Sequence, residues 1–208
     1  MSTLIIAPRS NINNMADWVA SANGRTLTVL NGLVTVREVL AHIASGKYRI
    51  IHFATHGCTT ALEVSDGIIP DHSLEDALRV AAGKVDLVIL GACNSVAIGA
   101  MLYRGGVPRV LSWRVEVSDR IAGLWATTFY RSLQMSNDIW DATVTAAEAV
   151  RNEGAEPPIY LNGRLVKLES QINELQAKNQ VGGVPRWVVG LFVAYGAMLA
   201  AIVGLLLR

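Results

Sequence analysis

Charge and cysteine are both scarce in this chain of 208 residues. Charged residues make up 17% of it and hydrophobic residues 51%, whereas soluble domains average roughly 25% charged residues. A composition this apolar excludes an intrinsically disordered protein. The 18 basic and 17 acidic residues nearly cancel, so the chain lacks the basic surface that nucleic-acid binding requires, and nucleic acid is not an expected partner.

We expect no signal peptide in MSTLIIAPRS, because its apolar part is too short and no cleavage site follows it. We therefore expect the globular part of the chain in the cytoplasm. The two cysteines, Cys58 and Cys93, are too far apart for a zinc pattern and are expected to be free thiols. Phosphate-loop, dinucleotide, H-E-x-x-H and G-x-S-x-G motifs are also missing, so we expect no cofactor and no metal.

The apolar excess lies at the carboxyl end. Residues 187–207, WVVGLFVAYGAMLAAIVGLLL, contain no charge over 21 positions, which is about 31 Å of helix and matches the bilayer core. They predict a single carboxyl-terminal transmembrane helix; the alternative is a buried helix of a soluble core. Gly196, Ala200 and Gly204 recur every four residues, so this helix is a candidate for homo-oligomer formation.

Short apolar runs with strand character alternate with helical patterns before that segment. The expected strands are 4–8, 26–30, 48–55, 86–90 and 109–113, with a hairpin at 61–70. The expected helices are 14–22, 36–44, 74–82 after a Ser73 cap, 96–104, from Ser118 or Asp119 to Leu133, and 139–150. Strands with little polar alternation suit a parallel sheet that is covered on both faces, so we predict an α/β/α sandwich.

The sequence divides into three parts. We assign 1–153 to the globular domain, because GAEPP breaks any helix there, 154–186 to a juxtamembrane linker with an amphipathic helix, and 187–208 to the membrane helix. In the linker, Leu165, Leu168, Ile172 and Leu175 form an apolar stripe. The stripe fits a short coiled-coil stalk or a helix packed on its own domain, and the sequence does not decide between them.

Two polar residues that follow apolar strands are the candidate catalytic residues. His56 ends IIHFATHG, and Cys93 follows DLVIL. Because the carboxyl ends of parallel strands form one ligand-binding edge, and neighbouring strands lie about 4.8 Å apart, both side chains are expected at one rim. An imidazole beside a thiol can take its proton as the sulfur attacks a carbonyl carbon.

The main-chain amides of Gly57 and Cys93 are candidates for an oxyanion hole, which makes acyl transfer the chemistry that this arrangement fits. A histidine at a strand end is more often a packed, hydrogen-bonded residue than a base. We assign that structural role to His52 and the role of base to His56.

On these motifs the sequence resembles the CHAT branch of the caspase-like cysteine peptidases, a clan that includes caspases, separases and gingipains. The motifs are HFATHG, SDGIIPDHSLEDAL, DLVILGACNS and MLYRGGVPRVLSWRVEVSDRIAGLWATTFYRSL. The resemblance covers about residues 1–150, and most specifically 48–133. It implies a caspase-like α/β/α sandwich with a mostly parallel sheet.

The resemblance also implies a catalytic dyad of His56 and Cys93, with the amides of Gly57 and Cys93 as the oxyanion hole. A protein substrate is then expected to pair as an added strand with Ser112, Trp113, Arg114 and Val115. Caspases carry Gln-Ala-Cys-Arg-Gly at the nucleophile, whereas this chain has Gly-Ala-Cys-Asn-Ser at 91–95, so caspase specificity does not carry over. Arg114 either binds an acidic side chain of the substrate or is an arginine exposed to solvent.

The implied protein is a membrane-anchored cysteine endopeptidase, and the kinship suggests a regulated bacterial defence or stress effector. The alternative from another class is a catalytically silent caspase-like scaffold whose membrane helix oligomerises or perforates the bilayer. A further alternative is a peptidase that oligomerisation through that helix activates.

Overall fold

The computed structural model describes residues 2–8 and 26–162. Three predictions lie outside these ranges: the helix at 14–22, the apolar stripe at 165–175 and the membrane helix at 187–207. Across the described residues, none of the helices has the length and apolar character needed to cross a bilayer.

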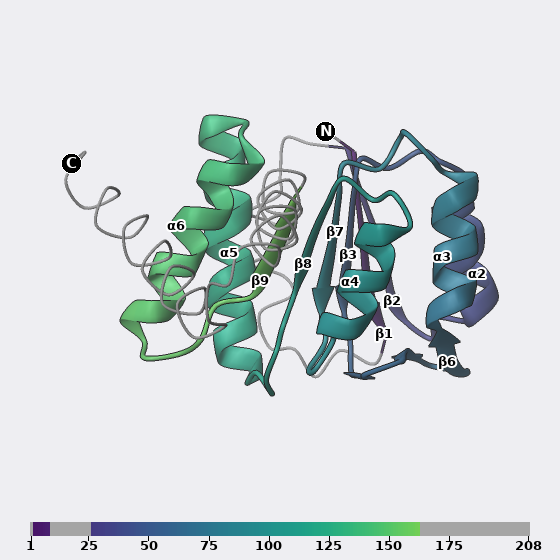
Figure 1. The fold of residues 1–208 in the computed structure, drawn as a ribbon, viewed down its shortest axis with the longest axis horizontal. Coiled ribbons are helices and arrows are strands. Elements are labelled where there is room, and N and C mark those ends of the chain that lie inside the picture. The colour runs from purple at the N-terminus through teal and green to yellow at the C-terminus, as the bar shows by residue number, and fades with distance from the viewer. Residues whose placement is uncertain (1, 9–25, 163–208) are drawn as a thin grey trace, which may run out of the picture. The chain divides into compact units, whose positions relative to one another are not determined.

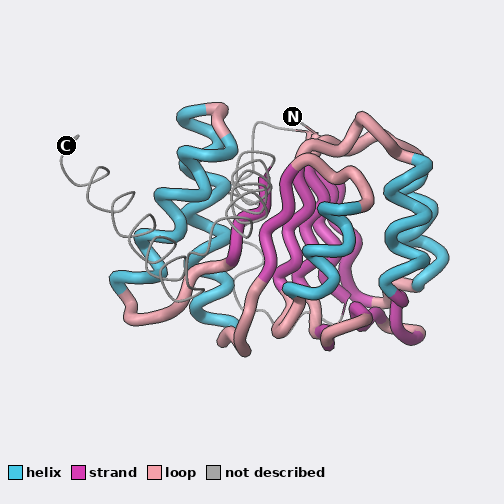
Figure 2. Tube along the Cα trace, viewed as in Figure 1, coloured by secondary structure: helices cyan, strands magenta, loops and turns pink. Residues whose placement is uncertain are grey.

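The described residues form a mixed α/β fold with a mostly parallel central sheet, which confirms that part of the predicted fold (Figures 1 and 2). The strands of this sheet, in spatial order, are β2 (Leu27–Gly32), β1 (Thr3–Pro8), β3 (Ile50–Ala54), β7 (Leu87–Gly91), β8 (Arg109–Ser112) and β9 (Ile159–Asn162). Only β9 pairs antiparallel within the described part of this sheet. The continuous apolar strands are buried because helices cover both faces.

Two layers of helices bury the two faces of the sheet (Figure 1). One layer holds α2 (Val36–Ala44), α3 (Asp71–Val80) and α4 (Val96–Arg104), and the other holds α5 (Asp119–Ser136) and α6 (Ile139–Asn152). Alternate strand residues divide between the two cores: Leu4 packs into the first and Ile5 into the second. The predicted bounds of α2 and α4 are confirmed to the residue.

A second, smaller sheet follows β3. It consists of β4 (Gly57–Cys58), β5 (Ala61–Val64) and β6 (Gly67–Pro70), so the predicted hairpin at 61–70 is confirmed. The hairpin turn is fastened to the start of α2: Asp66 Oδ1 accepts the Val36 N–H at 2.8 Å, and Ser65 Oγ accepts the Val34 N–H at 3.0 Å. The Asp66 carboxylate satisfies an amide of the first turn of α2, which a helix start leaves without a backbone partner.

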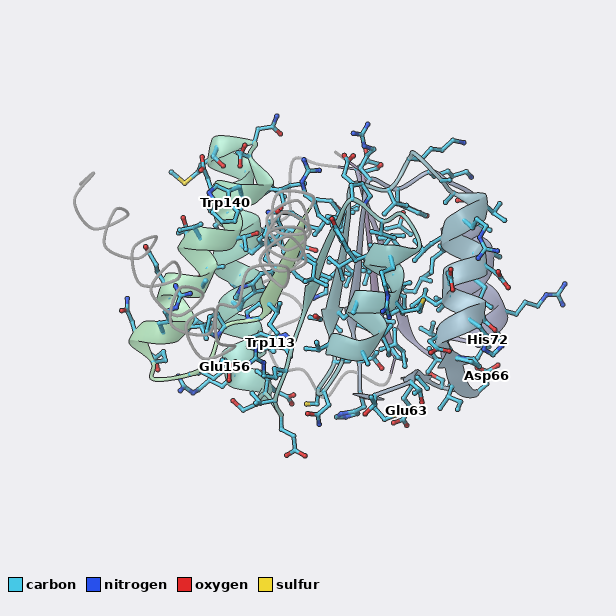
Figure 3. All side chains as sticks on the ribbon, in the orientation of Figure 1. Glu63, Asp66, His72, Trp113, Trp140 and Glu156 are labelled. Atoms are coloured by element: carbon cyan, nitrogen blue, oxygen red, sulfur yellow. The ribbon has the colours of Figure 1, made fainter. Side chains whose placement is uncertain are left out.

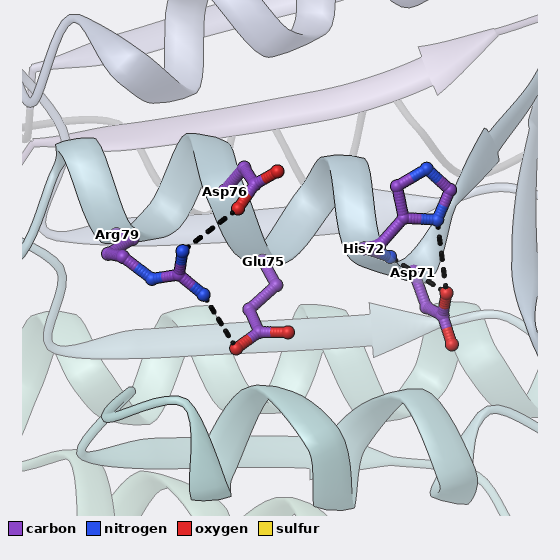
Figure 4. A network of polar contacts seen from close by, with 5 residues as sticks. All are labelled: Asp71, His72, Glu75, Asp76 and Arg79. Carbon is purple, nitrogen blue, oxygen red and sulfur yellow. Dashed lines mark hydrogen bonds and ion pairs between the residues drawn. The ribbon is translucent and has the colours of Figure 1, made fainter.

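Helix α3 begins earlier than predicted. Its first residue is Asp71, and Pro70 precedes it without a side-chain cap, so the predicted Ser73 cap is wrong. Proline fits this position because it fixes a backbone angle compatible with helix entry. Arg79 bonds to Glu75 and Asp76 at 3.1 Å each on the exposed face of α3 (Figure 4), and pairs of this kind contribute a few tenths of a kcal/mol.

The globular domain extends beyond its predicted end at 153. Strand β9 pairs with β8 from Arg109↔Asn162 to Ser112↔Ile159. The sequence GAEPP predicts the end of a helix, and α6 does end there, at Asn152, before Gly154 with its left-handed φ of 73°. Beyond Pro157 and Pro158 the chain turns back and adds a strand at the sheet edge.

His52 is buried in the centre of the sheet, as the sequence predicted for a packed supporting residue. It is 2% exposed, its Nδ1 lies 3.0 Å from Tyr130 Oη on α5, and the two rings stack. Burial lowers the pKa of His52 to about 3 and raises the pKa of Tyr130.

We expect His52 to make folding acid-sensitive. The native state keeps it neutral down to about pH 3, whereas the unfolded chain protonates it below its ordinary pKa of 6.5. The unfolded state therefore binds more protons between these values, so the free energy of unfolding falls as pH drops through them, by up to about 1.4 kcal/mol per unit. Denaturant titrations of the full chain at several pH values should give a flatter slope for His52→Phe. The exposed His72→Gln control should keep the wild-type slope, and equal slopes in all three proteins would contradict the assignment.

Candidate active site

The two candidate catalytic residues leave neighbouring strands at matching positions. Strands β3 and β7 are parallel partners whose register ends at Ala54↔Gly91. His56 and Cys93 each follow two residues later. The fold therefore delivers both to the carboxyl edge of the sheet, where the second sheet also lies (Figure 1).

The loops that carry these residues are in contact. A Cβ added to Gly57 would lie 2.9 Å from the Ala92 Cβ and 3.2 Å from the Ala61 carbonyl oxygen. Gly57 follows His56, and Ala92 precedes Cys93. Glycine is needed at 57 because no larger residue allows the two chain segments to approach this closely.

His56 is held by its backbone, and its side chain is exposed. The Glu63 N–H donates to the His56 carbonyl oxygen at 2.9 Å, and Gly57 pairs with Leu62 in the second sheet. Figure 3 shows Glu63 at this edge of the molecule. Among the described residues the imidazole makes no hydrogen bond or ion pair, and it is not bonded to Cys93.

The Cys93 thiol is half-buried and lies against the main chain of Val117. Its Sγ accepts a hydrogen bond from the Val117 N–H at 3.4 Å, and it donates a longer one, 3.8 Å, to the Val117 carbonyl oxygen. The sequence contained no signal for this contact, because both groups of Val117 belong to the backbone.

A tight turn fixes the backbone of Cys93. Asn94 adopts a left-handed φ of 54°, and the buried Ser95 follows it. Ser95 Oγ donates to the Leu90 carbonyl at 3.3 Å and accepts the Trp113 N–H at 3.2 Å, while its own N–H donates to the Trp113 carbonyl at 2.9 Å. Ser95 thus ties the cysteine turn to the segment after β8.

Gly57 and Cys93, the residues predicted to form an oxyanion hole, lie on the two touching segments. The Cys93 N–H donates to no acceptor within residues 2–8 and 26–162.

The predicted substrate-binding segment divides into a buried and an exposed half. Ser112 is fully buried against Gly99 of α4, and its backbone lies between Leu90 of β7 and Ile159 of β9. The Trp113 side chain is 2% exposed, and both of its backbone groups bond to Ser95. The backbones of both residues already have partners within the described residues, and their pairing with a substrate stays a prediction.

Arg114 and Val115 form the exposed half of this segment. The backbone of 114–116 makes no hydrogen bond within the described parts of the chain, which leaves an edge open for pairing. Arg114 Nε lies 3.8 Å from a carboxylate oxygen of Glu156, and both side chains are largely exposed. Figure 3 places Glu156 and Trp113 near one another at this side of the sheet.

Cys58 differs from Cys93 in its surroundings. It is exposed, and a backbone hydrogen bond from Thr60 lowers the pKa of its thiol. No cluster of three or more metal-ligating side chains occurs where the structure describes the chain.

Comparison with known proteins assigns the family. The CHAT domain family matches residues 4–173, more than half of the chain. The chain belongs to the CHAT domain family. No curated protein matches the sequence.

Two solved structures share the fold of this CHAT domain. A structure described as that of a protease aligns with a TM-score of 0.55 at 13% identity, over 77% of this chain and 46% of its own. Caspase-1 from Spodoptera frugiperda aligns with a TM-score of 0.53 at 12% identity, over 78% of this chain and 85% of its own. The chain thus spans less than half of the first structure. At these identities the likeness shows a caspase-like fold.

The contact between the two loops can be tested by a pair of substitutions in the CHAT domain. Gly57→Ala should lower the free energy of unfolding by about 1–3 kcal/mol, because its methyl group overlaps Ala92. Ala92→Gly removes the opposing methyl group, so the double variant should recover part of this loss. Denaturant titrations of the four proteins measure the coupling. Strictly additive effects would show that the loops do not touch.

Proposed function

We propose that the protein is a cysteine endopeptidase in which His56 and Cys93 form the catalytic dyad that cleaves a protein substrate. The observation that carries this proposal is the matched register of β3 and β7, which sends both residues to one edge, together with the contact between Gly57 and Ala92. The CHAT family and the caspase-like fold support the same reaction class.

The proposed reaction is acyl transfer followed by hydrolysis. His56 takes the Cys93 proton, the sulfur forms a bond to the substrate carbonyl carbon, and His56 returns the proton to the leaving amine as the C–N bond breaks. Water, deprotonated by His56, then releases the acid and restores the thiol. The exposed imidazole of His56 has room to turn toward the sulfur, since no described side chain holds it.

The main chain supplies the remaining parts. The amides of Gly57 and Cys93 are proposed to bind the developing oxyanion, and the Cys93 N–H is unoccupied by any described acceptor. The substrate backbone is proposed to add as a strand along Arg114 and Val115, whose own backbone groups make no hydrogen bond within the described residues.

We also propose that residues 187–207 anchor this peptidase in a membrane with its catalytic domain on the cytoplasmic side, and that it acts as a regulated defence or stress effector. The support is the uncharged run of 21 residues and, for the role, the kinship with CHAT proteins.

The peptidase proposal predicts a pattern among three variants of the full chain. Cys93→Ala should abolish cleavage, and His56→Ala should lower its rate by about 10²–10⁴-fold, because the base is lost. Cys58→Ala is the matched control, a second free thiol near the site, and it should retain activity. Comparing protein termini in cells that express each variant measures cleavage directly.

The silent scaffold is the other outcome of that experiment. If wild type and Cys93→Ala give the same protein termini, and thiol-reactive peptide probes label Cys58 but not Cys93, the peptidase proposal fails. A cellular effect that survives Cys93→Ala would then favour a scaffold.

Membrane anchoring has a separate test. Ending the chain at residue 186 should move the protein from the membrane fraction to the soluble fraction, because the truncation removes the uncharged run. Replacing 187–207 by an unrelated monomeric span should restore the membrane fraction. A full chain that remains soluble would contradict the anchor.

A further inference from the structure

The shorter of the two hydrogen bonds that the Cys93 thiol makes in the described structure comes from a main-chain amide. The Val117 N–H points at Sγ across 3.4 Å, whereas the Val117 carbonyl lies farther away, at 3.8 Å. A thiol can use both contacts. A thiolate can use only the N–H, and hydrogen bonds strengthen when the acceptor is charged.

We propose that the backbone N–H of Val117 is a catalytic group that stabilises the Cys93 thiolate before it attacks. This inference rests on the proposed function, in which Cys93 is the nucleophile. In this proposal Val117 helps to favour the thiolate, a role that a dyad otherwise leaves to the histidine. The His56 imidazole is not bonded to the sulfur in the described structure.

The chain around Val117 holds this donor in place from both sides. Upstream, both backbone groups of Trp113 are bonded to Ser95, two residues after the nucleophile. Downstream, Ser118 caps α5 by accepting the Ile121 N–H at 3.4 Å, and its carbonyl accepts the Ala122 N–H at 2.9 Å. Val117 itself packs against the core under α5 and α6. A donor fixed before the reaction needs no reorganisation when charge forms.

The donor changes two properties of the sulfur in opposite directions. In this proposal the donor favours the thiolate, which is the form that attacks, and it makes each thiolate a weaker nucleophile, because a more strongly stabilised thiolate reacts more slowly. The charged or titratable side chains on the flanking segments are His56, Arg114, Glu116 and Asp119. A change confined to the Val117 amide leaves all four in place.

The test replaces the Val117 amide by an ester, which removes the N–H and keeps the side chain. The full chain carries Cys58→Ala as background, since the exposed Cys58 thiol also reacts. Iodoacetamide is the probe: the sulfur forms a bond to carbon as iodide leaves. The rate of Cys93 alkylation is measured at about pH 7 and about pH 10, on either side of the range in which thiols ionise.

We expect the ester to slow alkylation about threefold to tenfold at neutral pH and to leave it unchanged or faster at high pH. Two controls keep the N–H of Val117: Val117→Ala, and the same ester replacement at Glu116, whose amide has no described partner. Both should match the background protein at both pH values.

Two other results overturn the inference. Equal rates for the ester and the background protein at both pH values show that the N–H does not act on the sulfur. If the ester lowers the alkylation rate by the same factor at both pH values, the segment around Val117 affects only the access of the probe to Cys93. Alkylation requires no peptide cleavage, so this experiment tests the Val117 amide independently of the peptidase proposal. The comparison of wild type with Cys93→Ala tests the peptidase proposal.

Discussion

The close packing of Gly57 on Ala92 is the contact on which the candidate site depends. Two parallel strands fix the direction in which their following loops leave the sheet, but they do not fix the distance between those loops. The contact between Gly57, which follows His56, and Ala92, which precedes Cys93, sets that distance. A methyl group on residue 57 would overlap the Ala92 side chain. Gly91 adds a second restriction in the same place, since a Cβ there would lie 2.6 Å from the Phe53 carbonyl oxygen. The two loops can pack together at the carboxyl edge of the sheet only because residues 57, 91 and 92 are small.

The two sides of the site are supported in different ways. Cys93 lies in a turn fastened to the central sheet through the buried Ser95, and its sulfur has a backbone partner. His56 belongs to a loop fastened to the second sheet, which is itself fixed to α2 through Asp66, while its imidazole stays exposed. The Cys93 sulfur is therefore fixed by its surroundings, whereas no described side chain holds the His56 imidazole. In the proposed dyad, the histidine is the partner that has to turn toward the sulfur.

Much of this fold could be predicted from local patterns. The strands β1, β3 and β7 are apolar on both faces, and α2 and α4 show their periodicity and ends directly, so sequence and structure agree there. Strand β9 was not predicted because it is only four residues long, follows two prolines and ends in Asn162, although Ile159 and Tyr160 are typical strand residues. The strand that lies beside Ser112 could not be predicted for a different reason: the neighbour of a strand depends on the rest of the sheet, and here β9 supplies it. Nothing at positions 109–112 encodes it.

Val117 shows the same limit at the site itself. Its contribution is an N–H group, which every residue except proline carries, so no residue type marks the position in the sequence. What places the amide at the sulfur is the path between Trp113, tied to Ser95, and Ser118, which caps α5. The side chain at 117 is needed only to pack on the core, and several apolar residues can do that. In the proposed site, the residue type at 117 can change while the N–H donor stays, because the Cys93 sulfur contacts the backbone of this residue and not its side chain.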